Sequence, residues 1–302
     1  MSESAPAMAD RGGAPPANRG HVPSSPRSLS THPARRPRLE RDELVELQTR
    51  EAGITARLEC ALNAASARVA LMSRAGCDLR RFRFDGEPPT YTHTGFAVRR
   101  DGAWYVHQML NTGSGPEGHL YRQSLVDFFR DDPYDYRCGV LVPSPGLQDA
   151  IAAVLDSPLA GSLYTPRYNR LAYPFCTRYQ NSNQWVAEIV AAAQGGGRSR
   201  TQVQAHLQRR GLVPSVLRAP GYVAQTAFAL LKANTRFDDH PLSNRLRGRI
   251  AFVTEVSLRD YLQRVDGLIL EQTVRLGPDP HREPPASSVP VVAQWSPGRS
   301  PS

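Results

Sequence analysis

Two polar positions, His93 and Ser182, are the residues of this chain whose surroundings best suit chemistry. Ser182 lies in the segment 179–188, Tyr-Gln-Asn-Ser-Asn-Gln-Trp-Val-Ala-Glu, in which polar residues directly precede an amphipathic helical pattern. The free backbone N–H groups of a helix start carry the positive end of the helix dipole, which favours a negatively charged nucleophile. His93 lies in Tyr-Thr-His-Thr-Gly-Phe-Ala-Val, a pattern that predicts a strand. The two residues are therefore a candidate nucleophile and its candidate base.

Small neighbours leave room around His93. On a strand, His93, Gly95 and Ala97 share one face, so the imidazole has access that a core-filling histidine lacks. His107 lies on the partner strand of a predicted hairpin, where it is placed to orient the His93 ring. The alternative is that both are ordinary strand histidines satisfied by backbone or water.

Ser182 has two interpretations. A serine hydroxyl is a weak nucleophile without a base within hydrogen-bond reach, and Asn181 followed by Gln184 fits a capping box that needs no catalysis. However, a plain cap does not need so many amides. Amide side chains also donate hydrogen bonds to an oxyanion or bind a ligand. The amides concerned are Gln180, Asn181, Asn183 and Gln184.

Hydrophobic periodicity predicts an α+β domain with a small antiparallel sheet packed with helices. The helical patterns cover 40–66, 120–130, 145–156, 182–194, 200–210, 220–233 and 257–263, and the strand patterns cover 69–72, 91–99, 103–110, 140–142 and 250–253. We expect one domain over 40–275. The leader 1–39 and the tail 276–302 are rich in Pro, Ser and Arg and poor in large apolar residues, so we expect both to be disordered.

The formal charge of +9 does not indicate nucleic-acid binding. Residues 1–41 contain seven arginines against three acidic residues, so nearly half of the excess lies in the leader. No helical pattern concentrates arginine on one face with interleaved aromatic residues, as a nucleic-acid platform requires. We therefore expect no nucleic-acid partner.

Cysteine spacing, hydropathy and acidic clusters exclude several further classes. The four cysteines form no CxxC pair, so no zinc site and no other cofactor is predicted, and reduced thiols are the simpler expectation. The cluster Asp238-Asp239-His240 lacks a longer-range partner for a metal. No apolar run has transmembrane length and the first thirty residues lack a signal-peptide core, which predicts a cytoplasmic protein as written. A periplasmic location is the alternative if the start codon is misassigned.

Two further positions are candidates for binding. Arg74 lies in a polar stretch, Ser-Arg-Ala-Gly-Cys-Asp at 73–78, that follows a buried strand and either borders the site or forms a surface turn. Trp185 and the tyrosines of 164–179 either line a groove or pack over the sheet.

Several of these blocks together resemble an uncharacterised bacterial family, the domain of unknown function numbered 2145. The blocks are Ser73-Arg74-Ala75-Gly76 with Asp78-Leu79, Tyr91-Thr92-His93-Thr94-Gly95, Trp104 with Val106, and Tyr179–Glu188. The resemblance covers about 55–270. This layout is in turn similar to circularly permuted papain-like hydrolases of the NlpC type, in which a Thr/Ser-His-x-Gly strand precedes the helix that carries the nucleophile.

By that resemblance, His93 matches the catalytic histidine and Ser182 the nucleophile, with His107 or Gln108 as the polar third residue. Papain-like enzymes have cysteine at the helix start, whereas this chain has Ser182. Two functions follow. The first is an amide or ester hydrolase or acyltransferase in which Ser182 attacks, His93 is the base and the amides at 181–184 stabilise the oxyanion. The second is a non-catalytic module that holds a small peptide, acyl or cell-wall-like ligand.

Overall fold

A computed structural model describes residues 41–276 except 81, 112–114, 131–134, 220, 223–224, 226–228 and 230–231. The leader and all of the predicted tail but Leu276 lie outside the described residues, as does most of the predicted helix 220–233. The helices are α1 (Arg41–Ala64), α2 (Leu125–Arg130), α3 (Pro145–Leu155), α4 (Pro158–Ser162), α5 (Ser182–Ala193), α6 (Arg200–Arg209), α8 (Leu242–Leu246) and α9 (Glu255–Arg264). The strands are β1 (Val69–Arg74), β2 (His93–Arg100), β3 (Ala103–Asn111), β4 (Gly118–Ser124), β5 (Arg137–Pro143), β6 (Ser215–Arg218), β7 (Arg249–Phe252) and β8 (Leu268–Arg275).

A six-stranded antiparallel sheet in the order β4-β3-β2-β1-β5-β8 forms the centre, which confirms the predicted α+β class. The hairpin between β2 and β3 turns at Asp101 and Gly102, whose φ angles of 51° and 80° are both left-handed. Such a turn matches the right-handed twist of the strands it joins. β6 and β7 pair separately as a two-stranded ribbon.

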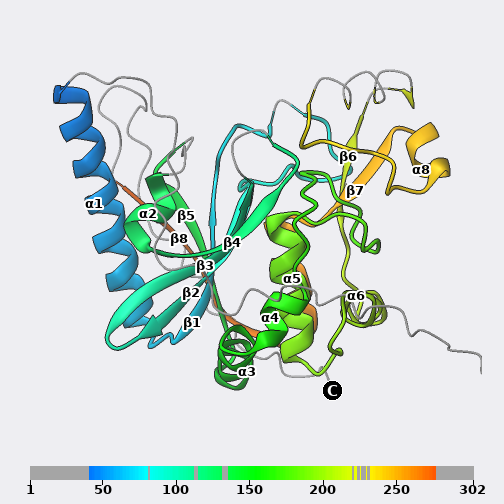
Figure 1. The fold of residues 1–302 in the computed structure, drawn as a ribbon. Coiled ribbons are helices and arrows are strands. Elements are labelled where there is room, and N and C mark those ends of the chain that lie inside the picture. The colour runs from blue at the N-terminus through cyan, green and yellow to red at the C-terminus, as the bar shows by residue number, and fades with distance from the viewer. Residues whose placement is uncertain are drawn as a thin grey trace, which may run out of the picture.

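Helices cover both faces of this sheet (Figure 1). Alternate residues of each strand point to opposite faces, and two core clusters separate accordingly. Phe96 and Val98 of β2 pack in the cluster that contains α5, with the rings of Phe96 and Trp185 edge to face at 5.9 Å. Ala97 packs in the other cluster, with α1 and α2. The central strands therefore have a face toward α5 and a face toward α1 and α2.

The structure corrects the prediction for 120–130. Residues 118–124 form β4, which pairs with β3 from Asn111↔Gly118 to Tyr105↔Ser124, and only Leu125–Arg130 is helical. The short apolar pattern of these residues fits both the helical and the strand period. Pairing with a long neighbouring strand therefore decided the conformation. The polar stretch after β1 also begins later than expected, because Ser73 and Arg74 belong to that strand. β6, β8, α4 and α8 were not predicted.

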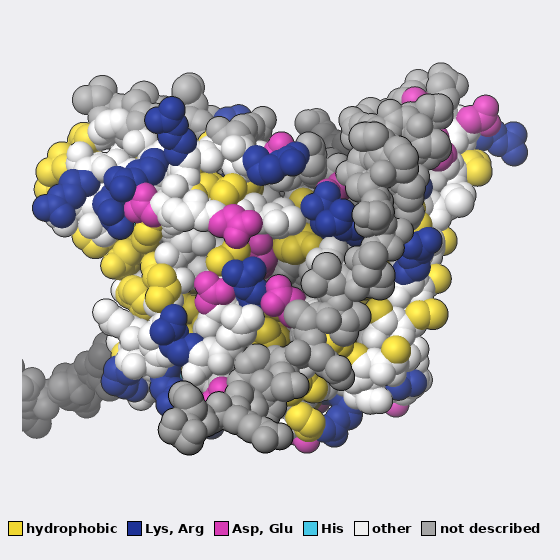
Figure 2. Space-filling model, turned by 180° about the vertical axis from the view of Figure 1, so that it is seen from behind, with side chains coloured by type: hydrophobic (Ala, Val, Ile, Leu, Met, Phe, Trp, Pro, Cys, Tyr) yellow, Lys and Arg dark blue, Asp and Glu magenta, His cyan; other side chains and the backbone are white. Residues whose placement is uncertain are grey.

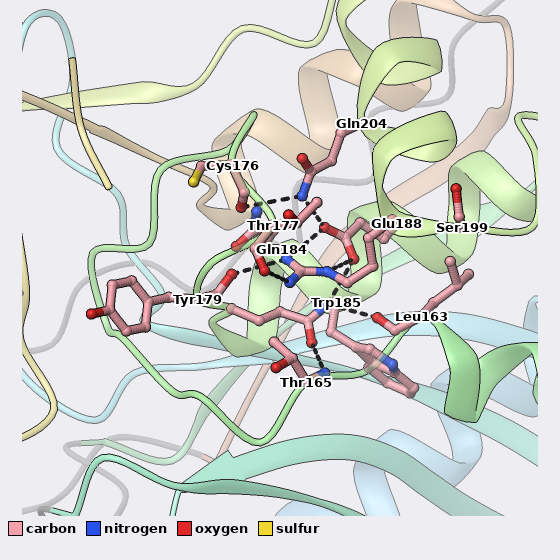
Figure 3. A network of polar contacts seen from close by, with 12 residues as sticks. Leu163, Thr165, Cys176, Thr177, Tyr179, Gln184, Trp185, Glu188, Ser199 and Gln204 are labelled. Carbon is pink, nitrogen blue, oxygen red and sulfur yellow. Dashed lines mark hydrogen bonds and ion pairs between the residues drawn. The ribbon is translucent and has the colours of Figure 1, made fainter. Parts of the chain in front are cut away.

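A buried polar network holds α5, α6 and the loop 163–181 together (Figure 3). Glu188, in the middle of α5, is fully buried and forms an ion pair with Arg200 of α6 at 2.8 Å. Gln180 and Gln204 donate further hydrogen bonds to the same carboxylate, each at 2.7 Å. Burial raises the pKa of Glu188, and the charge and hydrogen bonds of Arg200 are the largest opposing effects.

The rest of this network ties the loop backbone to the two helices. The Arg200 guanidinium also donates to the carbonyls of Thr177 and Tyr179, at 2.6 and 2.9 Å. The Gln180 side chain accepts from the Thr165 N–H and donates to the Leu163 carbonyl. These contacts fix both ends of the loop that leads into Ser182.

We expect Glu188→Ala to lower the free energy of unfolding by about 3–5 kcal/mol, because it leaves the buried Arg200 charge without its partner. Chemical denaturation followed by circular dichroism measures this change. Asp149→Ala is the matched control. It breaks the exposed Arg68–Asp149 pair and should change the same quantity by at most about 1 kcal/mol. Equal losses from both substitutions would contradict the role given to the network.

Candidate functional site

His93 begins β2, and its ring points toward the face covered by α1 and α2. Its Nε2 lies 2.6 Å from Oε1 of Gln108, on the neighbouring β3, and its ring centroid lies 5.9 Å from that of Phe128 in α2. Gln108 in turn donates its amide N–H to Oε1 of Gln123 on β4. Because the Gln108 amide nitrogen faces Gln123, its oxygen accepts from His93, so His93 carries its proton on Nε2 and a lone pair on Nδ1.

Burial and a neighbouring positive charge keep the ring of His93 neutral. Burial lowers the pKa of His93 to about 3, the positive charge of Arg74 adds to this effect, and the hydrogen bond with Gln108 opposes it. Arg74 is the cross-strand partner of His93, and its guanidinium lies 5.2 Å from the centroid of the Phe128 ring. At neutral pH the imidazole is therefore a weak base.

Ser182 is the first residue of α5 and is only 2% exposed. Its side chain lies near the phenol of Tyr168, which belongs to the core cluster on the α5 face. Burial raises the pKa of Tyr168, so the phenol stays protonated at neutral pH. The hydroxyl therefore lies beside another hydroxyl group, which cannot act as its base.

The amides around Ser182 brace the backbone. Asn181 caps α5, because its side-chain oxygen accepts the Gln184 N–H at 2.7 Å. The amide nitrogens of three residues then donate to backbone carbonyls: Asn181 to Arg170, Asn183 to Val253, and Gln184 to Tyr173 and Pro174. The predicted N-cap is confirmed. The return half of the capping box does not form, because the Gln184 side chain binds the 173–174 carbonyls.

The structure brings His93, Gln108 and Arg74 together, and it places Ser182 near the phenol of Tyr168. The amide of Asn183, next to Ser182, lies 3.5 Å from the carbonyl of Thr92, next to His93. No hydrogen bond joins His93 to Ser182 among the residues that the structure describes. Of the two candidates for the third residue, Gln108 contacts His93. His107 points to the opposite face, because successive residues of a strand alternate. Burial lowers the pKa of His107 to about 4, with the charge of Arg122 as the next cause.

Trp185 and the Asp238–His240 cluster serve packing and loop anchoring. Trp185 is 2% exposed, and its indole N–H lies 3.5 Å from the Ala160 carbonyl. Asp239 accepts the Tyr173 N–H at 2.8 Å, and Nε2 of His240 lies 2.7 Å from the Leu171 carbonyl. Burial raises the pKa of Asp239 to about 6 and lowers that of His240 to about 4.

The part of the chain that the structure describes has free thiols and no metal-binding cluster. No three His, Cys, Asp or Glu side chains gather there closely enough to hold a metal ion. The four cysteines are free thiols. No helix in that part of the chain combines the length and the apolar character needed to cross a bilayer.

A cavity of about 180 Å³ lies between the sheet, the start of α9 and the loop 87–91. Its sheet side is formed by β1, β5 and β8, on the face opposite α1. α9 lies behind α5 in Figure 1, so Figure 2 shows its side of the molecule, where acidic and basic side chains gather in the middle. The residues that line the cavity include Ser73, Thr90, Tyr91, Arg137, Gly139, Glu255, Arg259, Glu271, Thr273 and Arg275.

Glu255 is the most perturbed carboxylic acid of this cavity. It is the first residue of α9, and its Oε1 accepts the backbone N–H groups of Thr90 at 2.8 Å and Tyr91 at 3.2 Å. Burial raises the pKa of Glu255 to about 7, and the N–H groups of Tyr91 and Thr90 are the first effects that oppose it. Perturbed groups of this kind gather at binding and catalytic sites.

Sequence reasoning missed these cavity residues. The pattern Thr254-Glu255-Val256-Ser257 indicates a helix start, and a glutamate in a first turn is an ordinary dipole partner. Only the return of the chain at 90–91 buries this glutamate. Likewise, Arg137 and Arg275 become neighbours only because β8 pairs with β5.

We predict that the His93 imidazole stays neutral between pH 5 and 8, because its pKa lies near 3. Its folded-state pKa is below the unfolded value near 6.5, so the resulting stability is present above pH 6.5 and is lost as the pH falls toward 3. NMR titration of the ring resonances checks this. A midpoint near 6.5 for His93 would contradict the buried, Arg74-flanked geometry.

The comparisons with known proteins identify a family without a described activity. The model of the family DUF2145, "Uncharacterized protein conserved in bacteria", matches residues 61–262. Neither a curated protein nor a solved structure gives a significant match. The matched range contains β1, the His93 strand, α5 with its buried Glu188 and most of α9. By this match the chain belongs to the DUF2145 family of bacterial proteins.

Proposed function

We propose that this domain is a non-catalytic ligand-binding module, related in layout to permuted papain-like proteins of the NlpC type but without their nucleophilic chemistry. One observation carries the proposal: in the described part of the chain no hydrogen bond joins Ser182 to His93, whose ring is bonded to Gln108 and packs against Phe128. A serine needs a base within hydrogen-bond reach to attack a carbonyl. Neither the phenol of Tyr168 nor a histidine with a pKa near 3 is suited to that task.

The uses of the amides support the same proposal. An oxyanion hole needs donors that point at the position of the developing charge. The amide nitrogens of Asn181, Asn183 and Gln184 instead donate to backbone carbonyls of the loop and of the segment before α9. These groups therefore hold the fold around the start of α5.

The cavity beside α9 is the place that we assign to the ligand. Asn183 links it to the candidate helix start, because its amide bonds to the Val253 carbonyl, two residues before Glu255. The lining contains guanidinium, carboxyl and hydroxyl groups, which favour a small peptide-like molecule over an acyl chain.

A Ser-His hydrolase is the second candidate, and the tautomer of His93 favours it. The hydrogen bond between Nε2 and Gln108 leaves the lone pair on Nδ1, as a general base requires. For this chemistry, Nδ1 and the Ser182 hydroxyl would have to come within about 3 Å in a substrate complex.

The two candidates differ in their reaction with a fluorophosphonate probe. We expect no labelling of the wild-type protein, because Ser182 has no base among its contacts. Intact-protein mass spectrometry measures the adduct. Ser182→Ala is the matched control, because it removes the hydroxyl and keeps the helix start. Labelling of the wild type that disappears in Ser182→Ala would establish the hydrolase and reject the binding module.

The variant Ser182→Cys tests whether the start of α5 still activates a nucleophile. A helix N-terminus lowers a thiol pKa, whereas burial without a cationic partner raises it. Ser182 is 2% exposed and lies near a protonated phenol, so we expect alkylation by iodoacetamide at pH 7 to be slower than that of a free cysteine. The pH dependence of alkylation measures the pKa. A thiol pKa below 7 in this variant would favour a preserved catalytic site.

A further inference from the structure

The negative end of the α9 cavity is a carboxyl group with an unused oxygen. Glu255 is only 9% exposed, and Oε1 is fixed by the N–H groups of Thr90 and Tyr91. Its second oxygen, Oε2, is buried and has no hydrogen-bond partner among the described residues. A buried carboxyl oxygen without a donor costs free energy, so a donor supplied by a ligand would be favourable there.

The positive end of the cavity is a pair of arginines on adjacent strands. Arg137 of β5 and Arg275 of β8 are direct cross-strand partners, an arrangement in which like charges repel. Asp135 pairs with Arg137 at 3.1 Å, whereas the Arg275 guanidinium has no ion-pair partner in the described part of the chain. An anionic group between the two guanidinium groups would remove the repulsion and accept a bidentate hydrogen bond.

Tyr91 shows that these two ends belong to one site. Its ring covers Gly139, where an added Cβ would lie 2.6 Å from the ring, and its hydroxyl lies 3.3 Å from that of Thr273. Burial raises the pKa of Tyr91 to about 12, and the charges of Arg137 and Glu255 both reach the phenol with opposite signs. The opposed charges therefore both lie near one aromatic ring.

We propose that this cavity binds a small zwitterion, a free amino acid or a short peptide end, with its ammonium group at Glu255 and its carboxylate at Arg137 and Arg275. The location rests on the proposed function, and the ligand class goes beyond it. About 180 Å³ corresponds to roughly six water volumes, the size of a small amino acid. Tyr91 and Thr273 also line the cavity, and their hydroxyls can bind the polar backbone of such a ligand.

Binding of an ammonium group at Glu255 would release a proton near neutral pH. The free carboxyl group has a pKa of about 7, and a bound cation favours its ionised form. Affinity should therefore fall about tenfold per pH unit below 7 and level off above it. The charged or titratable groups that face this carboxyl group from the surrounding elements are Arg259 on α9, Glu87 and Tyr91 on the loop, Arg137 on β5, and Glu271 and Arg275 on β8.

Isothermal titration calorimetry of the full chain tests the proposal. The probes are glycine, L-alanine and L-alanyl-L-alanine, each with an N-acetylated analogue that lacks the ammonium group and an amidated analogue that lacks the carboxylate. We expect at least one zwitterion to bind, both of its analogues to bind at least tenfold more weakly, and proton release to appear as a dependence of the heat on buffer ionisation.

Matched variants separate the ligand contact from general charge and from folding. Glu255→Gln keeps an oxygen for the Thr90 and Tyr91 N–H groups, so it should fold as the wild type does but lose at least tenfold in affinity together with the proton release. Glu59→Gln, at an exposed carboxylate of α1 outside the cavity lining, should change affinity less than twofold. Circular dichroism of both variants checks the fold.

Three results would overturn the proposal. They are the absence of heat with all zwitterions, equal binding of the N-acetylated analogues, and unchanged affinity in Glu255→Gln. These results leave the non-catalytic assignment intact, because that assignment is decided by fluorophosphonate labelling of Ser182. Labelling of Ser182 would instead reject the non-catalytic assignment whatever the calorimetry shows.

Discussion

The buried pair of Glu188 and Arg200 is the interaction on which the architecture around α5 depends. An uncompensated charge in a protein core costs several kcal/mol, so each member is stable there only with its partner and hydrogen bonds in place. Arg200 uses its remaining donors on the carbonyls of Thr177 and Tyr179. The ion pair thus connects two helices and also fixes the loop that delivers the chain to Ser182.

This constraint explains why the start of α5 is so rich in amides. The loop 163–181, which has no strand or long helix, has many backbone carbonyls to satisfy, and buried carbonyls need donors. Asn181 and Gln184 supply them from the start of the helix. Residue types that suit an oxyanion hole are therefore equally suited to anchoring a loop, and their contacts decide between the two uses.

Burial lowers the pKa of His93 and raises the pKa of Glu255. His93 lies beside Arg74, so burial and charge both favour the neutral ring. Glu255 lies among backbone N–H groups that favour its ionised form, and these offset part of the effect of burial, leaving a pKa near 7. A group poised near neutral pH responds to a bound charge, whereas a group with a pKa near 3 does not. The cavity at α9 is accordingly the better place for ligand recognition.

The sequence by itself determined the α+β class, the hairpin at Asp101-Gly102, the N-cap at Asn181 and the ends of α1, α3, α5 and α6, because capping, turn geometry and periodicity act over a few residues. Tertiary structure alone decided that 118–124 is a strand, that Gln108 and not His107 contacts His93, and that Glu255, Arg137 and Arg275 line one cavity. Each of these depends on strand register and on which distant segment covers a face. A change of register by one residue reverses every side chain, and local sequence does not encode that choice.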